Sequence, residues 1–208
     1  MTTISNKKEA LDFLRSQQPM PFCEDLALDS EYVGNLLDSW GAALDFLIEN
    51  PCEEAIPLVL NSFGGGDGFE AYQTAGDFLS EFPIEVVLPY LTRALLSPNE
   101  LGKGMVADLS FDQLVRIDQK EVSPSFWDEI LLFVDACVKT LVETSLNGDP
   151  DPFTMRKVCL LWNIRRLDEK GFLNWEQYGA TIKECHSRDA GDKRLTKYYD
   201  EIFARHQG

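Results

Sequence analysis

The sequence predicts an all-α protein built from stacked helical hairpins, and three observations carry this prediction. Apolar side chains recur at spacings of three and four residues, as along the run from Val33 to Trp40. Helix-capping pairs such as Asn6 with Glu9 precede several of these runs. Nowhere does the chain contain the alternating, β-branched runs that strands require.

Two helices are expected before residue 51. Asn6 and Glu9 fit a capping box at the start of a short first helix, which the prolines at 19–21 end. A longer amphipathic helix covers residues 30–49, and the Asn-Pro pair at 50–51 stops it. Its apolar positions are Val33, Leu36, Leu37, Trp40, Leu44, Leu47 and Ile48.

The next segment, residues 51–113, has the pattern of a repeated unit. Three residue pairs lie 32 positions apart and align two segments without a gap as helix, turn and helix. Each segment begins with an apolar, proline-containing helix, at 55–60 in the first and 86–96 in the second. The pairs are Pro57 with Pro89, Phe69 with Leu101, and Ala75 with Ala107.

Residues 121–206 continue as helical hairpins. Pro124 opens a helix that the Asn-Gly pair at 147–148 ends, and the Asp-Pro pair at 151–152 suits the start of the following helix. A further capping box begins at Asn174, and a last helix is expected at 192–204. The apolar positions of the helix that starts at Pro124 are Trp127, Ile130, Leu131, Val134, Cys137, Val138 and Leu141.

The segments Ala-Ile-Pro-Leu-Val-Leu at 55–60 and Val-Val-Leu-Pro-Tyr-Leu at 86–91 resemble the first helices of HEAT-type repeats. The resemblance covers residues 51–113 as two HEAT-like helix pairs, and the rest of the chain by helix-pair spacing. It implies one helical domain over 1–208, either a HEAT-like right-handed α-solenoid or an irregular helical array. In a solenoid each unit contacts mainly its neighbours, and the curved face binds macromolecules.

Charge is distributed unevenly along the chain, whose net charge is -16. Residues 16–92 hold 14 acids and no Lys or Arg, although the average of 19 bases in 208 residues would place about seven there. Exposed helix positions usually mix the two signs, because i,i+4 ion pairs each contribute a few tenths of a kcal/mol. A segment without such pairs is therefore expected to serve another purpose.

The acids of this segment fall on two helical lines that we expect to bind a partner. Residues spaced by seven lie within about 40° of one another on a helix, so the acids of helix 30–49 form one stripe opposite its apolar face. A second line is expected on the second helix of the first repeat. The first line comprises Glu31, Asp38, Asp45 and Glu49, and the second comprises Glu70, Asp77 and Glu81.

Side chains suited to catalysis are few. The two histidines, His186 and His206, lie near the C-terminus, and Cys185 would point about 100° away from His186 on a helix, so these are interpreted as structural or surface residues. The Gly-rich segment 64–68 lacks the Lys and Ser/Thr of a phosphate-binding loop, and 168–175 lacks calcium-ligand spacing, so both are interpreted as turns. We expect that the chain is not an enzyme and binds no cofactor or metal. The sequence leaves open a catalytic pair of carboxylates among its 35 acids.

We expect a folded protein in the cytoplasm. Its 44% hydrophobic and 26% charged residues are typical of globular chains, and its five scattered cysteines predict reduced thiols without a zinc site. The longest stretch without a charged residue, 55–66, is far shorter than the roughly 20 residues of a membrane span. Residues 1–9 lack the apolar core of a secretory signal, and we expect a monomer or weak oligomer.

The leading functional hypothesis is a protein-binding inhibitor. A small, acidic, helical chain without catalytic motifs is similar in profile to bacterial immunity proteins of polymorphic or contact-dependent toxin systems. That resemblance implies a cognate toxin as partner, and a toxin that binds phosphates would be basic. A general HEAT-like scaffold or adaptor is the first alternative, and an all-α enzyme acting on nucleic acid is the second.

One basic cluster bears on the second alternative. Five bases between residues 156 and 170 lie in a segment, 151–208, whose net charge is only +2, whereas a nucleic-acid site needs a basic groove. We interpret these bases as the counterpart of acids within the helical stack and expect no direct contact with nucleic acid. They are Arg156, Lys157, Arg165, Arg166 and Lys170.

Overall fold

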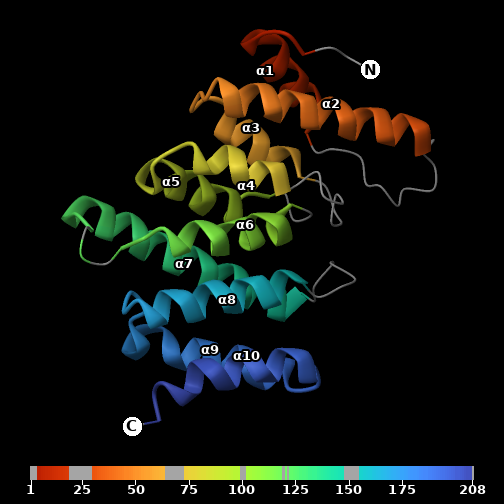
Figure 1. The fold of residues 1–208 in the computed structure, drawn as a ribbon. Helices are drawn as coiled ribbons and strands as arrows, with labels where there is room; N and C mark the ends of the chain where they lie inside the picture. The colour runs from red at the N-terminus through yellow and green to blue at the C-terminus, as the bar shows by residue number, and fades with distance from the viewer. Residues whose placement is uncertain are drawn as a thin grey trace.

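The computed structural model describes residues 4–18, 30–63, 73–98, 102–118, 120, 122–147 and 155–207, which form ten α-helices and no strand. Figure 1 shows them stacked from the N-terminus to the C-terminus. The helices are α1 (Lys7–Ser16), α2 (Ser30–Glu49), α3 (Ala55–Ser62), α4 (Gln73–Ser80), α5 (Ile84–Leu95), α6 (Lys103–Val115), α7 (Pro124–Asn147), α8 (Met155–Glu169), α9 (Trp175–Asp189) and α10 (Lys193–Ala204).

The helices form two rows that run the length of the stack. Odd-numbered helices contact one another in the order α1, α3, α5, α7, α9, and even-numbered helices in the order α2, α4, α6, α8, α10. Helices of one hairpin also contact each other across the rows, as α5 does α6 and α7 does α8. The two termini therefore lie at opposite ends of the stack (Figure 1). The prediction of an all-α fold of stacked helical hairpins is confirmed.

Capping side chains fix where several helices begin, as the sequence predicts. The Asn6 side chain accepts a hydrogen bond from the backbone N–H of Glu9 at 3.0 Å, and Asn174 accepts one from Gln177 at 3.3 Å. Asp192 accepts from the backbone of Arg194 at 2.9 Å and begins α10. Each cap satisfies a backbone donor that has no partner inside its helix.

The first repeat segment holds α3 and α4 and the second holds α5 and α6, and the prolines of the two segments occupy different helix positions. Pro57 is the third residue of α3, where a missing N–H costs nothing, whereas Pro89 lies well inside α5. Ala75 of α4 and Ala107 of α6 are both fully buried, in helices that contact each other. Of the aligned residues, the buried alanine therefore has the same environment in both segments. Phe69 and Leu101 lie outside the described residues.

The turn between α8 and α9 confirms the interpretation of residues 168–175. Gly171 has a φ of 70°, its N–H donates to the carbonyl of Asp168, and the N–H of Phe172 donates to the carbonyl of Leu167, both at 2.9 Å. These two bonds close the C-terminus of α8 in a Schellman motif, in which glycine is favoured. The segments interpreted as a loop at 19–21 and a turn at 64–68 lie outside the described residues, as does the Asp-Pro pair at 151–152 that is expected to start a helix.

One continuous core joins all ten helices, from Ala10 of α1 to Ile202 of α10. Trp40 orients α2 within this core. Its ring is fully buried, its indole N–H donates to Ser62 Oγ at 2.9 Å, and the ring lies 6.3 Å from that of Phe63. Because the indole has a hydrogen-bond partner, its burial carries no unsatisfied donor. The opposite side of α2 consequently faces solvent.

Candidate functional site

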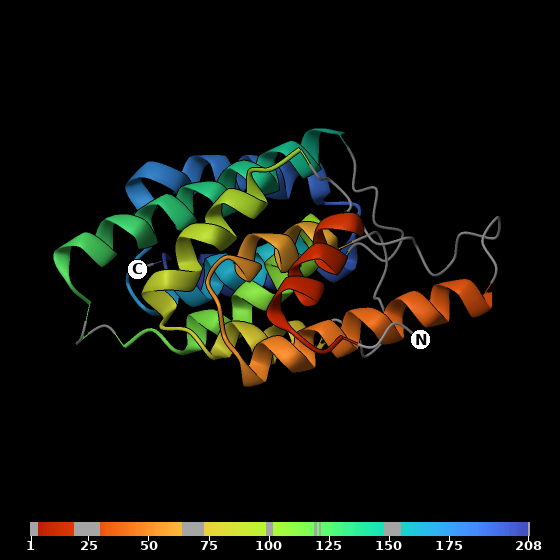
Figure 2. The same ribbon diagram turned by 90° about the horizontal axis from the view of Figure 1, so that it is seen from above.

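The first acidic line lies on α2 as the sequence predicts. Glu31, Asp38, Asp45 and Glu49 are all exposed, on the side of the helix opposite Trp40. Seen from above in Figure 2, the first turns of α2 extend past the rest of the stack. The line therefore runs along a helix that is packed on one side and open on the other.

The second acidic line lies on the neighbouring helix of the same row. Asp77 is exposed on α4, which contacts α2, and Glu81 is exposed one residue beyond the end of α4. The N–H of Glu81 donates to the carbonyl of Phe78 at 3.2 Å, so a 3₁₀-type bond continues the helical path to that residue. Glu70 lies outside the described residues. We call the exposed acids of these two lines, from α2 and α4, the acidic surface.

No base neutralises most of the acidic surface. All 19 Lys and Arg residues lie in the described part of the chain. Within that part, none pairs with Asp38, Asp45 or Glu49 of α2, nor with Asp77 or Glu81. Asp45 and Glu49 lie about 6 Å apart along the helix axis, within the Debye length of about 8 Å at physiological salt, so these two carboxylates repel each other. The seven-residue spacing of Glu31, Asp38 and Asp45 corresponds to about 10 Å, at which salt screens most of the repulsion.

The acids at the α2–α3 turn behave differently, although they belong to the same base-free segment. Glu54 pairs with Arg15 at 2.5 Å and with Lys7 at 3.9 Å, both supplied by the region of α1. Glu53 accepts a hydrogen bond from the Tyr90 hydroxyl at 2.9 Å, and this bond raises the pKa of the tyrosine. The acids of this turn therefore have hydrogen-bond or ion-pair partners among the described residues, unlike Asp38, Asp45 and Glu49 of the acidic surface.

Most bases of the predicted basic cluster form ion pairs with acids of the stack, as the sequence predicts. Arg165 pairs with Glu201 and, at 3.3 Å, with Glu169, which also pairs with Arg166 at 3.2 Å. The Lys170 ammonium donates to the carbonyl of Ile117. Lys157 pairs with a buried acid described below, and Arg156 is itself buried. These bases hold α8 to its neighbours and do not line an open basic groove.

A buried polar cluster in the C-terminal hairpins escapes prediction from the sequence. The carboxylate of Asp189 accepts hydrogen bonds from Lys157 Nζ at 2.8 Å, the Tyr199 hydroxyl at 2.8 Å and Ser145 Oγ at 3.0 Å. The four side chains come from α9, α8, α10 and α7, and Lys157 and Asp189 are both at least nine-tenths buried. Burial, together with Asp189, raises the pKa of Tyr199. The cluster joins four helices through one fully satisfied carboxylate.

Comparison of the chain with protein-family models, with curated proteins and with solved structures gives no match. No helix of the described residues is long and apolar enough to cross a membrane. The same residues contain no group of three or more His, Cys, Asp or Glu side chains placed to hold a metal ion. A function for the acidic surface is therefore argued only from the positions and charges of its own residues.

The side chains considered for chemistry pack into the C-terminal core. Cys185 is buried, and burial raises the pKa of its thiol above the usual range. The His186 ring packs 5.0 Å from Tyr199 and 5.3 Å from Phe203. His206 stacks on Trp175 at a centroid distance of 4.1 Å. These contacts agree with the interpretation of both histidines and Cys185 as structural residues.

A second buried carboxylate anchors the C-terminal end of the chain. Asp168 contacts Arg205 Nε at 2.7 Å and His206 Nε2 at 3.0 Å, and its side chain is only 4% exposed. Because His206 also stacks on Trp175, residues 205–206 are held against the α8–α9 turn from two directions. The sequence carries no local signal for this contact, since its partners are more than 35 residues apart.

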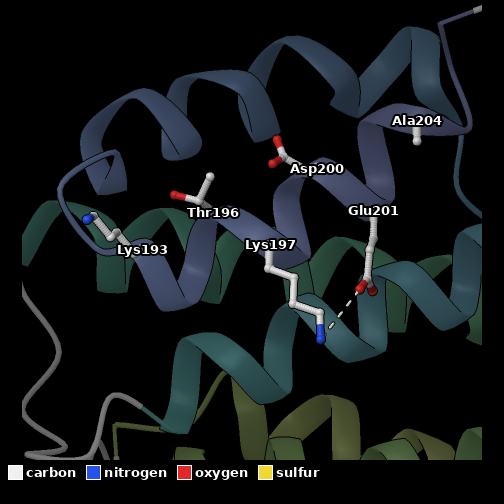
Figure 3. Close-up of a pocket in the computed structure, with 6 residues that line it drawn as sticks. All are labelled: Lys193, Thr196, Lys197, Asp200, Glu201 and Ala204. Carbon is white, nitrogen blue, oxygen red and sulfur yellow. Dashed lines mark ion pairs between the residues drawn. The ribbon is translucent and has the colours of Figure 1, made fainter.

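One open hollow lies on the outer face of α10, at the end of the stack (Figure 3). Its six lining side chains all come from that helix, and Lys197 pairs with Glu201 at 4.0 Å across it. Binding sites for small molecules usually gather groups from several elements around an enclosed space. This hollow does not have that construction. The lining residues are Lys193, Thr196, Lys197, Asp200, Glu201 and Ala204.

Proposed function

We propose that this chain is a protein-binding inhibitor that neutralises a basic partner protein through the acidic surface. The observation that carries the proposal is that exposed acids on two neighbouring helices have no base among the described residues paired with them, namely Asp38, Asp45 and Glu49 of α2 and Asp77 of α4. Like charges placed in lines repel one another at a small cost. A basic partner would remove that repulsion, speed the encounter and exclude partners of the wrong charge.

The inhibitor that best fits this surface is an immunity protein acting in the bacterial cytoplasm. Nuclease toxins carry basic surfaces because they bind phosphates, and a line of carboxylates can occupy such a surface in place of the nucleic-acid backbone. The rigid backing of α2 by Trp40 supports this role, because a preorganised face loses little freedom on binding. The proposal requires one cognate partner and a complex that weakens as salt rises.

The test compares charge reversal on the acidic surface with the same reversal elsewhere. The surface variant carries Asp38→Lys, Asp45→Lys and Asp77→Lys. The control variant carries Asp112→Lys, Glu176→Lys and Asp200→Lys, at acids that are also exposed but lie on α6, α9 and α10. Both variants and the unmodified chain are immobilised and exposed to lysate of the source cells at ~0.15 M salt.

We expect the unmodified chain and the control variant to retain the same basic protein and the surface variant to lose it. The retained protein is then purified, its activity is assayed with and without the chain, and its Kd is measured for all three forms. Equal affinity of the surface variant would refute the role of the acidic surface. Retention of an acidic protein, or no inhibition of the retained protein, would refute the inhibitor function.

A further inference from the structure

Large apolar side chains are exposed at the start of α7, away from the acidic surface. Four of the seven exposed large apolar residues in the described chain belong to this one helix. Three of them, Trp127, Leu131 and Leu132, lie within two turns and are 38%, 38% and 56% exposed. We call these three residues the α7 patch. Scattered single apolar residues are normal on a protein surface, but a contiguous group marks an interaction site.

The α7 patch is held rigidly by its neighbours. The Trp127 ring packs edge to face on buried Phe172 at a centroid distance of 4.9 Å. One turn beyond Leu131, Asp135 accepts a hydrogen bond from the hydroxyl of Tyr178 on α9 at 3.5 Å. Figure 2 shows the first turns of α7 projecting from the stack on the side opposite the projecting end of α2. The patch is therefore separate from the acidic surface and accessible.

Acids border the α7 patch on the same face of the helix. Asp128 and Asp135 are exposed, at spacings of three and four residues from Leu131, and Glu129 beside them is half-buried. The nearest base on this face is Lys139, one turn beyond Asp135. Around the patch the local charge is negative, as is the net charge of -16 for the whole chain. A second copy of the chain would bring two negative surfaces together, so self-association is a poor fit.

We propose that the α7 patch binds a basic amphipathic helix of a partner protein. The apolar side of such a helix would cover Trp127, Leu131 and Leu132, and its Lys or Arg residues would reach Asp128 and Asp135. An amphipathic helix laid on an apolar face presents its anchors at spacings of three and four residues, and Trp127 and Leu131 of the patch likewise lie four residues apart. This contact is independent of the proposed inhibitor function, because it uses neither α2 nor α4.

Synthetic peptides test the proposal with the full chain. The probe is a fluorescein-labelled peptide of about five helical turns, with Leu on one face and Lys on the other. One comparison peptide replaces every Leu by Ser, and a second replaces every Lys by Glu. Binding is followed by fluorescence anisotropy at ~0.15 M salt. We expect the Leu/Lys peptide to bind at least about tenfold more tightly than either comparison peptide.

Variants locate the binding site. The double variant Leu131→Ser/Leu132→Ser is expected to weaken binding of the Leu/Lys peptide by about tenfold or more. The matched control Leu96→Ser/Val115→Ser changes two other exposed apolar residues, which are 45% and 56% exposed, and is expected to bind as the unmodified chain does. Asp38→Lys/Asp45→Lys is also expected to leave this binding unchanged. Thermal unfolding followed by circular dichroism checks that each variant is folded.

Five results would overturn the proposal. The first is no detectable binding of the Leu/Lys peptide, and the second is equal binding of the Leu/Glu peptide. The third is unchanged affinity in a folded Leu131→Ser/Leu132→Ser variant. The fourth is a concentration-dependent dimer that this variant abolishes, which would identify a second copy as the occupant. Loss of binding in Asp38→Lys/Asp45→Lys alone would assign the peptide to the acidic surface and likewise contradict the proposal.

Discussion

Acidic side chains have opposite environments at the two ends of this molecule. In the last two hairpins, Asp168 and Asp189 are buried and each accepts contacts from two or more partners. In the first two hairpins, Asp38, Asp45 and Asp77 are exposed and have no base paired with them among the described residues. The residue type is the same, so the difference arises from where the chain places its bases.

The distribution of bases explains this contrast. Residues 151–208 carry 11 Lys and Arg, whereas 16–92 carry none. A buried carboxylate is tolerated only with partners that satisfy it, because moving an isolated charge out of water is costly. An exposed carboxylate needs no partner for folding. Asp168 and Asp189 therefore hold helices together, while Asp38, Asp45 and Asp77 contribute charge and little stability.

Removal of the most deeply engaged acid should have the largest effect. Asp189→Ala leaves the Lys157 ammonium buried without its counter-charge, so we expect the free energy of unfolding to fall by about 3–5 kcal/mol. Urea denaturation measures the loss. The matched variant Asp45→Ala on α2 is expected to change the same quantity by less than about 0.5 kcal/mol. Similar losses in the two variants would contradict the contrast between the two ends.

Asp168→Ala should have the second-largest effect. It removes a buried acceptor from Arg205 and His206, and hydrogen bonds to charged groups contribute about 1.5–3 kcal/mol. Urea denaturation again gives the magnitude, and the fluorescence of Trp175 should change because His206 stacks on its ring. Asp77→Ala serves as the exposed control. An unchanged free energy of unfolding for Asp168→Ala would show that the C-terminal anchor contributes nothing.

Asp108, in the middle of the stack, has an environment between these two extremes: its side chain is half-buried, and no Lys or Arg of the described residues is paired with it. Burial against α8 raises the pKa of Asp108, whose carboxylate accepts a hydrogen bond from the Cys159 thiol at 3.6 Å. The folded protein therefore holds this proton more tightly than the unfolded chain, and the resulting stabilisation below the ordinary pKa is lost as pH rises through the folded value. Asp108→Asn should raise the melting temperature at pH ~7 and match the unmodified chain well below pH ~4.

Two outcomes of the pH series would contradict this prediction. A melting temperature for Asp108→Asn that is lower than that of the unmodified chain at pH ~7 would show that the charged carboxylate is stabilised by its surroundings. A difference that persists at pH values well below the ordinary aspartate pKa of about 3.9 would assign the effect to packing, because the carboxyl is then neutral in both the folded and the unfolded state.

The smallest effect on stability is expected at the acidic surface itself. The triple variant Asp38→Asn/Asp45→Asn/Glu49→Gln removes like-charge repulsion worth a few tenths of a kcal/mol per pair, so the free energy of unfolding should stay level or rise slightly. Added salt should stabilise the unmodified chain more than the variant, because salt screens a repulsion that the variant lacks. A loss of more than about 1 kcal/mol would reveal structural partners for these carboxylates.

Local signals in the sequence account for much of the fold. Periodicity and flanking residues predict α2 with the bounds that the structure has, and the caps at Asn6 and Asn174 are both present. Lys157 and Asp189, in contrast, are 32 residues apart on different helices, and only packing brings them together. Helical periodicity also places Trp127 on the apolar side of α7, yet its side chain is 38% exposed, because the described helices leave part of its ring uncovered.

The salt dependence of the complex tests whether charge drives its formation. We propose that the acidic surface binds a basic protein by charge, with exposed acids that folding does not need. The Kd of the captured partner would be measured between ~0.05 and ~0.5 M salt for the unmodified chain and for Asp38→Lys/Asp45→Lys/Asp77→Lys. We predict that the Kd of the unmodified chain rises steeply with salt and that the variant does not bind in low salt. A Kd that is independent of salt and equal in both proteins would contradict the proposal.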